Sequence, residues 1–172
     1  MDIILIIILP GALLIYAVVI FNRLVSDKNT VLQGWSDVEV QLKRRHDLLP
    51  KLVESVKQYA SYESATLEAV TSLRQKSQVV TQVKDKAQLE SELNVSISRL
   101  IAIAENYPDL KANESFQHLL KNITDVEEHI QYARRFYNGA VKNLNVRIDS
   151  FPDLFIARLF KYKPAEYFEF DE

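Results

Sequence analysis

The sequence predicts an all-α protein in which a single N-terminal transmembrane helix precedes an antiparallel four-helix bundle of long helices. Three observations support this fold class. Residues 3–21 carry no charged side chain. The 172 residues include 3 glycines and 5 prolines, so the chain has little use for tight turns. Beyond the first segment, apolar residues recur every three or four positions, which is the period of a helix with one buried face.

The composition excludes several classes of protein. Hydrophobic residues make up 48% of the chain and charged residues 26%, as in an ordinary globular protein. The net charge is −2, so no basic excess supports a nucleic-acid partner. The absence of cysteine excludes disulfides, thiolate metal sites, cysteine nucleophiles and a lipoprotein anchor.

Residues 1–22 are predicted to form a membrane anchor. A helix over residues 3–21 rises about 28 Å, which is enough to cross the hydrocarbon layer. Pro10 and Gly11 interrupt the apolar run, but neither excludes a transmembrane helix. A cleaved signal peptide is the alternative, yet Asp2 stands where its positive region belongs, and a small-x-small cleavage site is hard to find.

The charges around the anchor predict its orientation. Arg23 and Lys28 follow the span, with three more basic residues at 43–45, whereas Asp2 precedes it. By the positive-inside rule, the N-terminus lies outside and the bundle lies in the cytoplasm.

Residues 23–154 are predicted to form the bundle, whose first helix continues directly out of the membrane. Pro50 disturbs its pattern, and two interpretations stay open. Asp47 could cap a new helix that begins there, or the helix could continue with a kink.

Three further apolar stripes complete the predicted bundle. The second stripe covers residues 52–73. The third covers 89–104 and follows a D-x-x-Q capping signal at 85–88, with residues 75–86 expected to form a flexible loop. The last, over 116–151, predicts about 54 Å of helix. Such helices hide their apolar stripes best by packing on one another.

Residues 155–172 are predicted to form an aromatic-rich C-terminal tail. Its aromatic residues are Phe155, Phe160, Tyr162, Tyr167, Phe168 and Phe170. Two interpretations stay open: the tail packs back on the bundle, or it docks on another subunit or partner.

The sequence lacks the common motifs of catalytic, phosphate-binding and metal sites. It has no Glu-x-x-His pair for a di-iron site, no H-E-x-x-H, no glycine-rich phosphate loop and no G-x-S-x-G elbow. No serine stands on a recognisable sharp turn, and no carboxylate stands in an obvious apolar cleft. We therefore expect no catalytic residue, cofactor or metal ligand, and no enzymatic activity.

Polar residues on the first and last helices of the bundle predict a structural network. Asp37, Gln41 and Arg45 align at four-residue spacing beside the apolar stripe, where an arginine could pair with a carboxylate of a neighbouring helix. The alternative is contact with lipid headgroups or a partner protein. The full predicted set is Asp37, Gln41, Arg44, Arg45, Asp47, Glu127, Arg134 and Asn138.

Close helix packing is predicted at Gly34, Trp35 and Gly139. A glycine inside a helix costs about 1 kcal/mol relative to alanine. Close approach to a neighbouring helix, within or between subunits, explains these glycines, and random tolerance explains them almost as well.

Two segments of the chain resemble the LemA family: GWSDVEVQLKRRHDLLPKLV at 34–53 and AENYPDLKAN at 104–113. The resemblance continues at Phe116, Leu119, Glu127, Ala133, Arg134, Tyr137, Asn138, Val141, Asn145, Phe151, Pro152, Phe168 and Glu169. It implies a membrane-anchored, antiparallel helical bundle of bacteria with a short outside N-terminal segment. It brings no catalytic residues, and it implies an association with membrane organisation, including magnetosome membranes, and with a membrane metalloprotease of the HtpX type.

We therefore expect a non-enzymatic scaffold, single-pass in the bacterial inner (cytoplasmic) membrane, that self-assembles and organises or remodels that membrane. The alternative is an adaptor for membrane protein quality control that serves an HtpX-like protease. The expected partners are the lipid bilayer, further copies of the chain and, for the adaptor alternative, that protease, with no nucleic acid and no cofactor.

Overall fold

The computed structural model describes residues 2–169, with side chains from residue 9 onwards, and within that range the protein is all-helical. Phe170, one of the tail aromatics, lies outside the described residues. The helices are α1 (Asp2–Lys57), α2 (Ser64–Val79), α3 (Val83–Ala104), α4 (Pro108–Lys111), α5 (Glu114–Asp149) and α6 (Asp153–Leu159).

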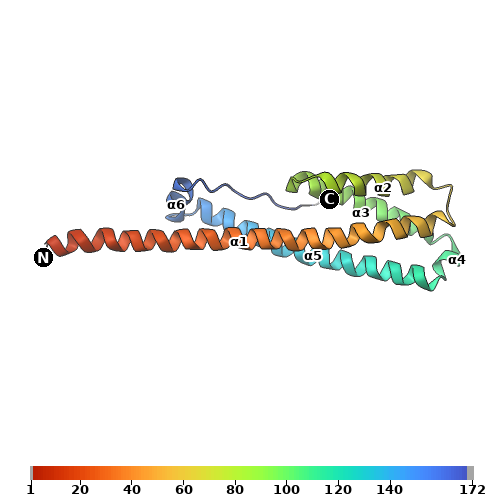
Figure 1. The fold of residues 1–172 in the computed structure, drawn as a ribbon, viewed down its shortest axis with the longest axis horizontal. Coiled ribbons are helices and arrows are strands. Elements are labelled where there is room, and N and C mark those ends of the chain that lie inside the picture. The colour runs from red at the N-terminus through yellow and green to blue at the C-terminus, as the bar shows by residue number, and fades with distance from the viewer. Residues whose placement is uncertain (1, 170–172) are drawn as a thin grey trace.

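Helix α1 is one continuous helix of 56 residues that contains both Pro10 and Pro50. Its expected continuation out of the apolar segment is confirmed, and at Pro50 the structure takes the continuous alternative. At 1.5 Å per residue, α1 is about 84 Å long. Figure 1 shows its N-terminal part extending beyond the other helices. Among the described helices, α1 alone is long and apolar enough to cross a membrane.

Pro50 is tolerated because another helix replaces the hydrogen bond that proline removes. The carbonyl of His46 would normally accept from the N–H four residues later, but Pro50 has no N–H. Arg74 of α2 donates its Nε–H to this carbonyl at 2.7 Å. The orphaned acceptor is thereby satisfied, and α2 is tied to α1.

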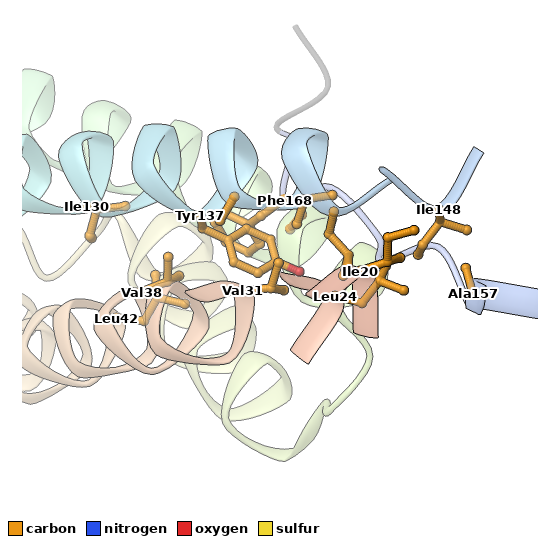
Figure 2. Packing of buried hydrophobic residues seen from close by; sticks show 14 of the residues in the cluster. Ile20, Leu24, Val31, Val38, Leu42, Ile130, Tyr137, Ile148, Ala157 and Phe168 are labelled. Carbon is orange, nitrogen blue, oxygen red and sulfur yellow. The ribbon is translucent and has the colours of Figure 1, made fainter. Parts of the chain in front are cut away.

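The buried face of α1 follows a heptad pattern. Its buried positions are spaced four and three residues apart: Val38, Leu42, Arg45, Leu49, Leu52 and Val56. This spacing is typical of a helix that packs along a partner at a small crossing angle. In Figure 1, α5 returns along α1 in the opposite direction. Figure 2 shows the seam between them, where Val31 and Val38 lie close to Tyr137 and Ile130.

Helices α2 and α3 pack against each other beside this pair (Figure 1). The flexible loop expected at 75–86 is wrong, because α2 continues through Val79 and α3 begins at Val83. The capping signal at 85–88 also misplaced the start of α3, which begins two residues earlier with no side-chain cap on Gln82. Ser77, inside the expected loop, and Ala87, directly after it, are buried, and this packing keeps the segment helical.

The long last helix matches its prediction within two residues at each end. Helix α5 spans 36 residues, and Asn113 caps it by accepting a hydrogen bond from the Phe116 N–H at 3.1 Å. The short helix α4 separates α3 from α5.

The C-terminal segment packs back on the molecule. Helix α6 crosses the boundary expected between bundle and tail at 154/155, and its Ala157 joins a core cluster with Ile20, Leu24 and Ile148 (Figure 2). After α6 the chain has no regular secondary structure through residue 169. Of the two interpretations of the tail, packing on the bundle describes its last part, which ends at the fully buried Phe168.

Substitutions at Arg74 and Pro50 test the Pro50 repair, by which we mean that the Arg74 side chain replaces the hydrogen bond that Pro50 removes. We expect Arg74→Met to lower the free energy of unfolding by about 1–3 kcal/mol, because the His46 carbonyl is left without a donor. In a Pro50→Ala background, the restored backbone N–H can serve this carbonyl, so the same Arg74→Met change should cost less. Denaturant unfolding of all four chains, followed by circular dichroism, measures the coupling, and equal losses in both backgrounds would contradict the repair.

Candidate functional site

We call the helical part of the molecule that follows the apolar span of α1 the body. Five polar side chains from four helices meet inside the body, and we call them the ionic cluster. They are Arg45 and His46 of α1, Ser77 of α2, Glu90 of α3 and Glu127 of α5. Arg45, His46, Ser77 and Glu90 are buried, and Glu127 reaches the cluster from a partly exposed position.

The Glu90 carboxylate is the centre of the ionic cluster. It pairs with the Arg45 guanidinium, accepts from the Ser77 hydroxyl, and lies 2.8 Å from Nε2 of His46. Arg45 also donates to Glu127 at 2.9 Å. One carboxylate thus joins α1, α2 and α3, and Arg45 adds α5.

The surroundings of Glu90 favour its charged form. Burial alone would raise the pKa of the Glu90 carboxyl, but the hydrogen bond with His46, the Arg45 charge and the hydrogen bond from Ser77 together lower that pKa to about 2. Because an ionised carboxylate only accepts hydrogen bonds, Nε2 of His46 must carry a proton.

The ionic cluster contains a serine, a histidine and a carboxylate, but not the order of a catalytic triad. In a triad, the serine hydroxyl bonds to the imidazole, and the carboxylate bonds to the other ring nitrogen. Here the Ser77 hydroxyl and Nε2 of His46 both bond to the same oxygen of Glu90, so the histidine is not placed to take the serine proton. Within residues 9–169, no group of three or more His, Asp or Glu side chains is arranged to hold a metal ion.

Two polar atoms of the ionic cluster have no hydrogen-bond partner among the described residues, Nε of Arg45 and Oε1 of Glu127. Each is the second atom of a group that already bonds through another atom. A buried charge pair is costly to assemble and strongly destabilising to break from one side, so this arrangement serves to fix the helices relative to one another.

A second polar feature holds the tail, and we call it the tail clasp. Asn138 donates to the Phe168 carbonyl at 3.0 Å and accepts from the Phe168 N–H at 2.9 Å. Asn145 does the same with Ala165, at 3.0 and 2.8 Å. Between them, the Tyr137 hydroxyl donates to the Glu166 carbonyl at 2.7 Å.

The spacing of the tail clasp follows from helix and strand geometry. Asn138 and Asn145 are seven residues apart on α5, which is about 10.5 Å along a helix. Ala165 and Phe168 are three residues apart, which is about 10 Å in an extended chain. The two side-chain amides therefore pair with the tail backbone as a neighbouring strand would.

Phe168 fills the end of the tail clasp. Its ring is 5.6 Å from the Trp35 ring, which in turn lies 5.3 Å from the Tyr137 ring. Gly34 allows this approach of α1 and α5, since a Cβ there would lie 3.1 Å from the Tyr137 Cα and 3.2 Å from a ring carbon of Phe136.

The structure divides the predicted site residues among several places. It brings Arg45 and Glu127 together, and it puts Asn138 and Trp35 at the tail clasp. The remaining residues lie elsewhere: Asp37 and Asp47 are exposed on α1, Gln41 accepts from exposed Arg44 at 3.1 Å, and Arg134 is partly buried on α5. At Gly139 an added Cβ meets nothing within 4 Å, so close packing within this chain does not account for that glycine.

Sequence reasoning missed His46, Ser77, Glu90 and Asn145. A signal for Glu90 existed, because it lies on the apolar stripe of α3 with Ala87, Leu93 and Ile97. A lone carboxylate at a core position implies a basic partner, and Arg45 is the basic residue at a core position of α1. No comparable signal marks Ser77 or Asn145.

Comparisons with known proteins agree with the resemblance. The model of the LemA family matches residues 34–172. Protein LemA of Metamycoplasma hominis is 29% identical over 131 residues, covering 76% of this chain and 60% of that protein. Magnetosome protein MamQ 2 of Paramagnetospirillum magneticum is 30% identical over 74 residues, covering 43% of this chain and 27% of that protein. MamQ of Magnetospirillum gryphiswaldense is 30% identical over 73 residues, covering 42% and 27%. The match thus spans less than two thirds of each of these relatives.

Replacing the central carboxylate tests the ionic cluster. Glu90→Gln leaves the buried Arg45 without its main counter-charge, so we expect the free energy of unfolding to fall by about 3–5 kcal/mol at neutral pH. The exposed Glu68→Gln on α2 is the matched control, with an expected change within about 0.5 kcal/mol.

Acid should lower the stability of the fold by protonating the Glu90 carboxylate. Its folded-state pKa of about 2 lies below the ordinary value of 4.5, so the unfolded chain binds a proton first as the pH falls. Stability from Glu90 is therefore present above pH 4.5 and is lost between 4.5 and about 2. Denaturant unfolding across this range should show a weaker pH dependence for Glu90→Gln than for the unmodified chain, and identical slopes would contradict the assignment.

The tail clasp makes a separate prediction. Replacing Asn138 and Asn145 together by alanine removes four hydrogen bonds to the tail backbone, and we expect amide exchange at Ala165 and Phe168 to accelerate by about tenfold or more. Asn143→Ala, on an exposed part of the same helix, is the control and should leave both amides protected. Hydrogen exchange with mass spectrometry measures this, and unchanged protection in the double variant would show that the side-chain amides do not hold the tail.

Proposed function

The chain belongs to the LemA family, and we propose that it is a membrane-anchored, non-enzymatic scaffold that self-assembles and organises or remodels the bacterial inner membrane. The observation that carries the proposal is the continuity of α1. One helix supplies both the apolar span and the heptad face of the body, so the body is held at a fixed position relative to the anchor.

The packing of the body supports a rigid scaffold. We propose that the C-terminal part of α1 forms an antiparallel four-helix bundle with α2, α3 and α5. The ionic cluster contacts all four of these helices, so its ion pairs and hydrogen bonds tie them together.

The names of the relatives support a role in membrane organisation. Both MamQ relatives described above are named magnetosome proteins, in agreement with the association that the family resemblance implies. We place the chain as single-pass, with the N-terminus outside and the body in the cytoplasm, because the basic residues follow the span.

An exposed stripe on α5 is the proposed surface for self-assembly. Tyr132, Phe136, Gly139, Asn143 and Val146 are exposed and spaced four and three residues apart, so they share one face of the helix. A second helix can approach closely at Gly139, since a Cβ there meets nothing within the chain. This supplies the role between subunits that the sequence left open for Gly139.

Membrane anchoring sets the geometry of this contact. Copies in one bilayer stand side by side with the same direction, so two α5 stripes meet in parallel. In a two-fold contact of parallel helices, a residue on the stripe lies opposite its own copy.

The chain has no cysteine, so single-cysteine variants test the contact cleanly. In membranes, Asn143→Cys should oxidise to a disulfide-linked homodimer, whereas Ser98→Cys, exposed on α3, should remain a monomer. Adding Gly139→Leu should abolish the dimer by blocking the close approach. Equal cross-linking at both positions would contradict the stripe as an interface. Adducts with one stoichiometric membrane protease, in place of the homodimer, would favour the quality-control adaptor.

A further inference from the structure

Helix α6 and its neighbours present apolar side chains that the fold does not use. Phe151 is 78% exposed, Phe155 61% and Leu159 71%. The rings of Phe151 and Phe155 contact each other edge to face, with centroids 5.9 Å apart, and Phe160 beside them is also exposed. We call Phe151, Phe155 and Leu159 the α6 patch. Contiguous exposed apolar side chains of this size mark an interaction surface.

The position of the α6 patch along α1 identifies what covers it. The Phe160 ring lies 4.6 Å from the Phe21 ring, at the end of the apolar span. Ala157 packs with Ile20 and Leu24, which occupy the same level of α1 (Figure 2). In Figure 1, α6 stands at the end of the body that faces the N-terminal part of α1.

The level of the bilayer surface on α1 follows from its sequence. The uncharged run ends at Phe21, and Arg23 is the first charged side chain after it. A helix that crosses the hydrocarbon layer over residues 3–21 leaves it close to these two residues. Helix α6 therefore lies at the depth of the headgroups, the region where aromatic side chains are enriched in membrane proteins.

The charges around the α6 patch fit an anionic membrane surface. Arg23, Arg158, Lys161 and Lys163 are exposed at this end of the body. The acidic side chains of Asp27 and Asp153 are both paired with Arg147, at 2.5 and 3.1 Å, so this trio keeps one net negative charge, and exposed Asp149 adds another. The four exposed basic residues outnumber these two negative charges. Basic residues close to an anionic leaflet are attracted to its headgroups.

We propose that the α6 patch inserts into the interface of the same membrane that α1 crosses, with the basic rim bound to anionic headgroups. The body then rests on the bilayer through a second contact beside its anchor. This proposal rests on the proposed membrane anchor, but it goes further, because an anchor alone does not require the exposed side chains of α6 to insert among the lipids. Insertion of apolar side chains at this depth is sensitive to membrane curvature and lipid composition.

Site-directed spin labelling of the full chain tests this depth. A nitroxide is attached at Leu14→Cys on the span, at Phe155→Cys on the α6 patch, or at Tyr62→Cys, a 96% exposed position beyond the far end of α1. The chains are reconstituted in vesicles of phosphatidylcholine with phosphatidylglycerol. Power saturation then compares collisions with oxygen, which concentrates in the bilayer, and with a water-soluble nickel chelate.

We expect the ratio of oxygen to nickel collisions to be highest at position 14, intermediate at 155 and lowest at 62. The ratio at 155 should fall when phosphatidylglycerol is omitted, because the basic rim loses its anionic partners. A ratio at 155 equal to that at 62, with position 14 still inside the bilayer, would overturn the proposal and leave the anchor intact. A low ratio at position 14 would instead overturn the anchor. Spin–spin broadening at 155 without oxygen preference would assign the patch to a second copy and also overturn the proposal.

Discussion

The pairing of Arg45 with Glu90 is the constraint on which the rest of the body depends. Both residues occupy core positions of their helices, where either charge alone would cost several kcal/mol. Each supplies the main counter-charge of the other, so their pairing favours one register of α1 against α3. A buried polar residue at a heptad position is a well-attested way to fix register. Ser77 and Glu127 extend the same constraint to α2 and α5.

Continuity of α1 turns this local constraint into a property of the whole molecule. Arg74 satisfies the carbonyl that Pro50 leaves orphaned, so the helix passes through the proline without ending. The helix that carries the ionic cluster is therefore the helix that carries the apolar span. Since Ile20 and Leu24 are already buried against α5 and α6, no free linker separates the anchor from the body.

The C-terminal segment packs against the C-terminal half of α5 and adds a second set of long-range polar contacts. The two asparagines of the tail clasp match an extended chain to a helix, and Phe168 is buried where Gly34 lets α1 and α5 approach. Holding the tail leaves α6 in a defined place beside the exit of the span. Among the aromatic side chains of the C-terminal region, Phe168 is buried, whereas Phe151, Phe155 and Phe160 are exposed at the level proposed for the membrane surface.

By itself, the sequence determined the helical class, the apolar span and, within two residues, the limits of α5, because these depend on local periodicity and charge. It also suggested that Arg45, beside the core stripe of its helix, could pair with a carboxylate of a neighbouring helix, and it named Glu127 in the same predicted network. The tertiary structure alone decided that residues 75–86 are mostly helical. It also decided that Glu90 and Ser77 complete the ionic cluster, and that Asn145 forms hydrogen bonds with the tail backbone. Those contacts join residues far apart in the chain. Spacing along one helix does not reveal which distant side chain will satisfy a buried polar group.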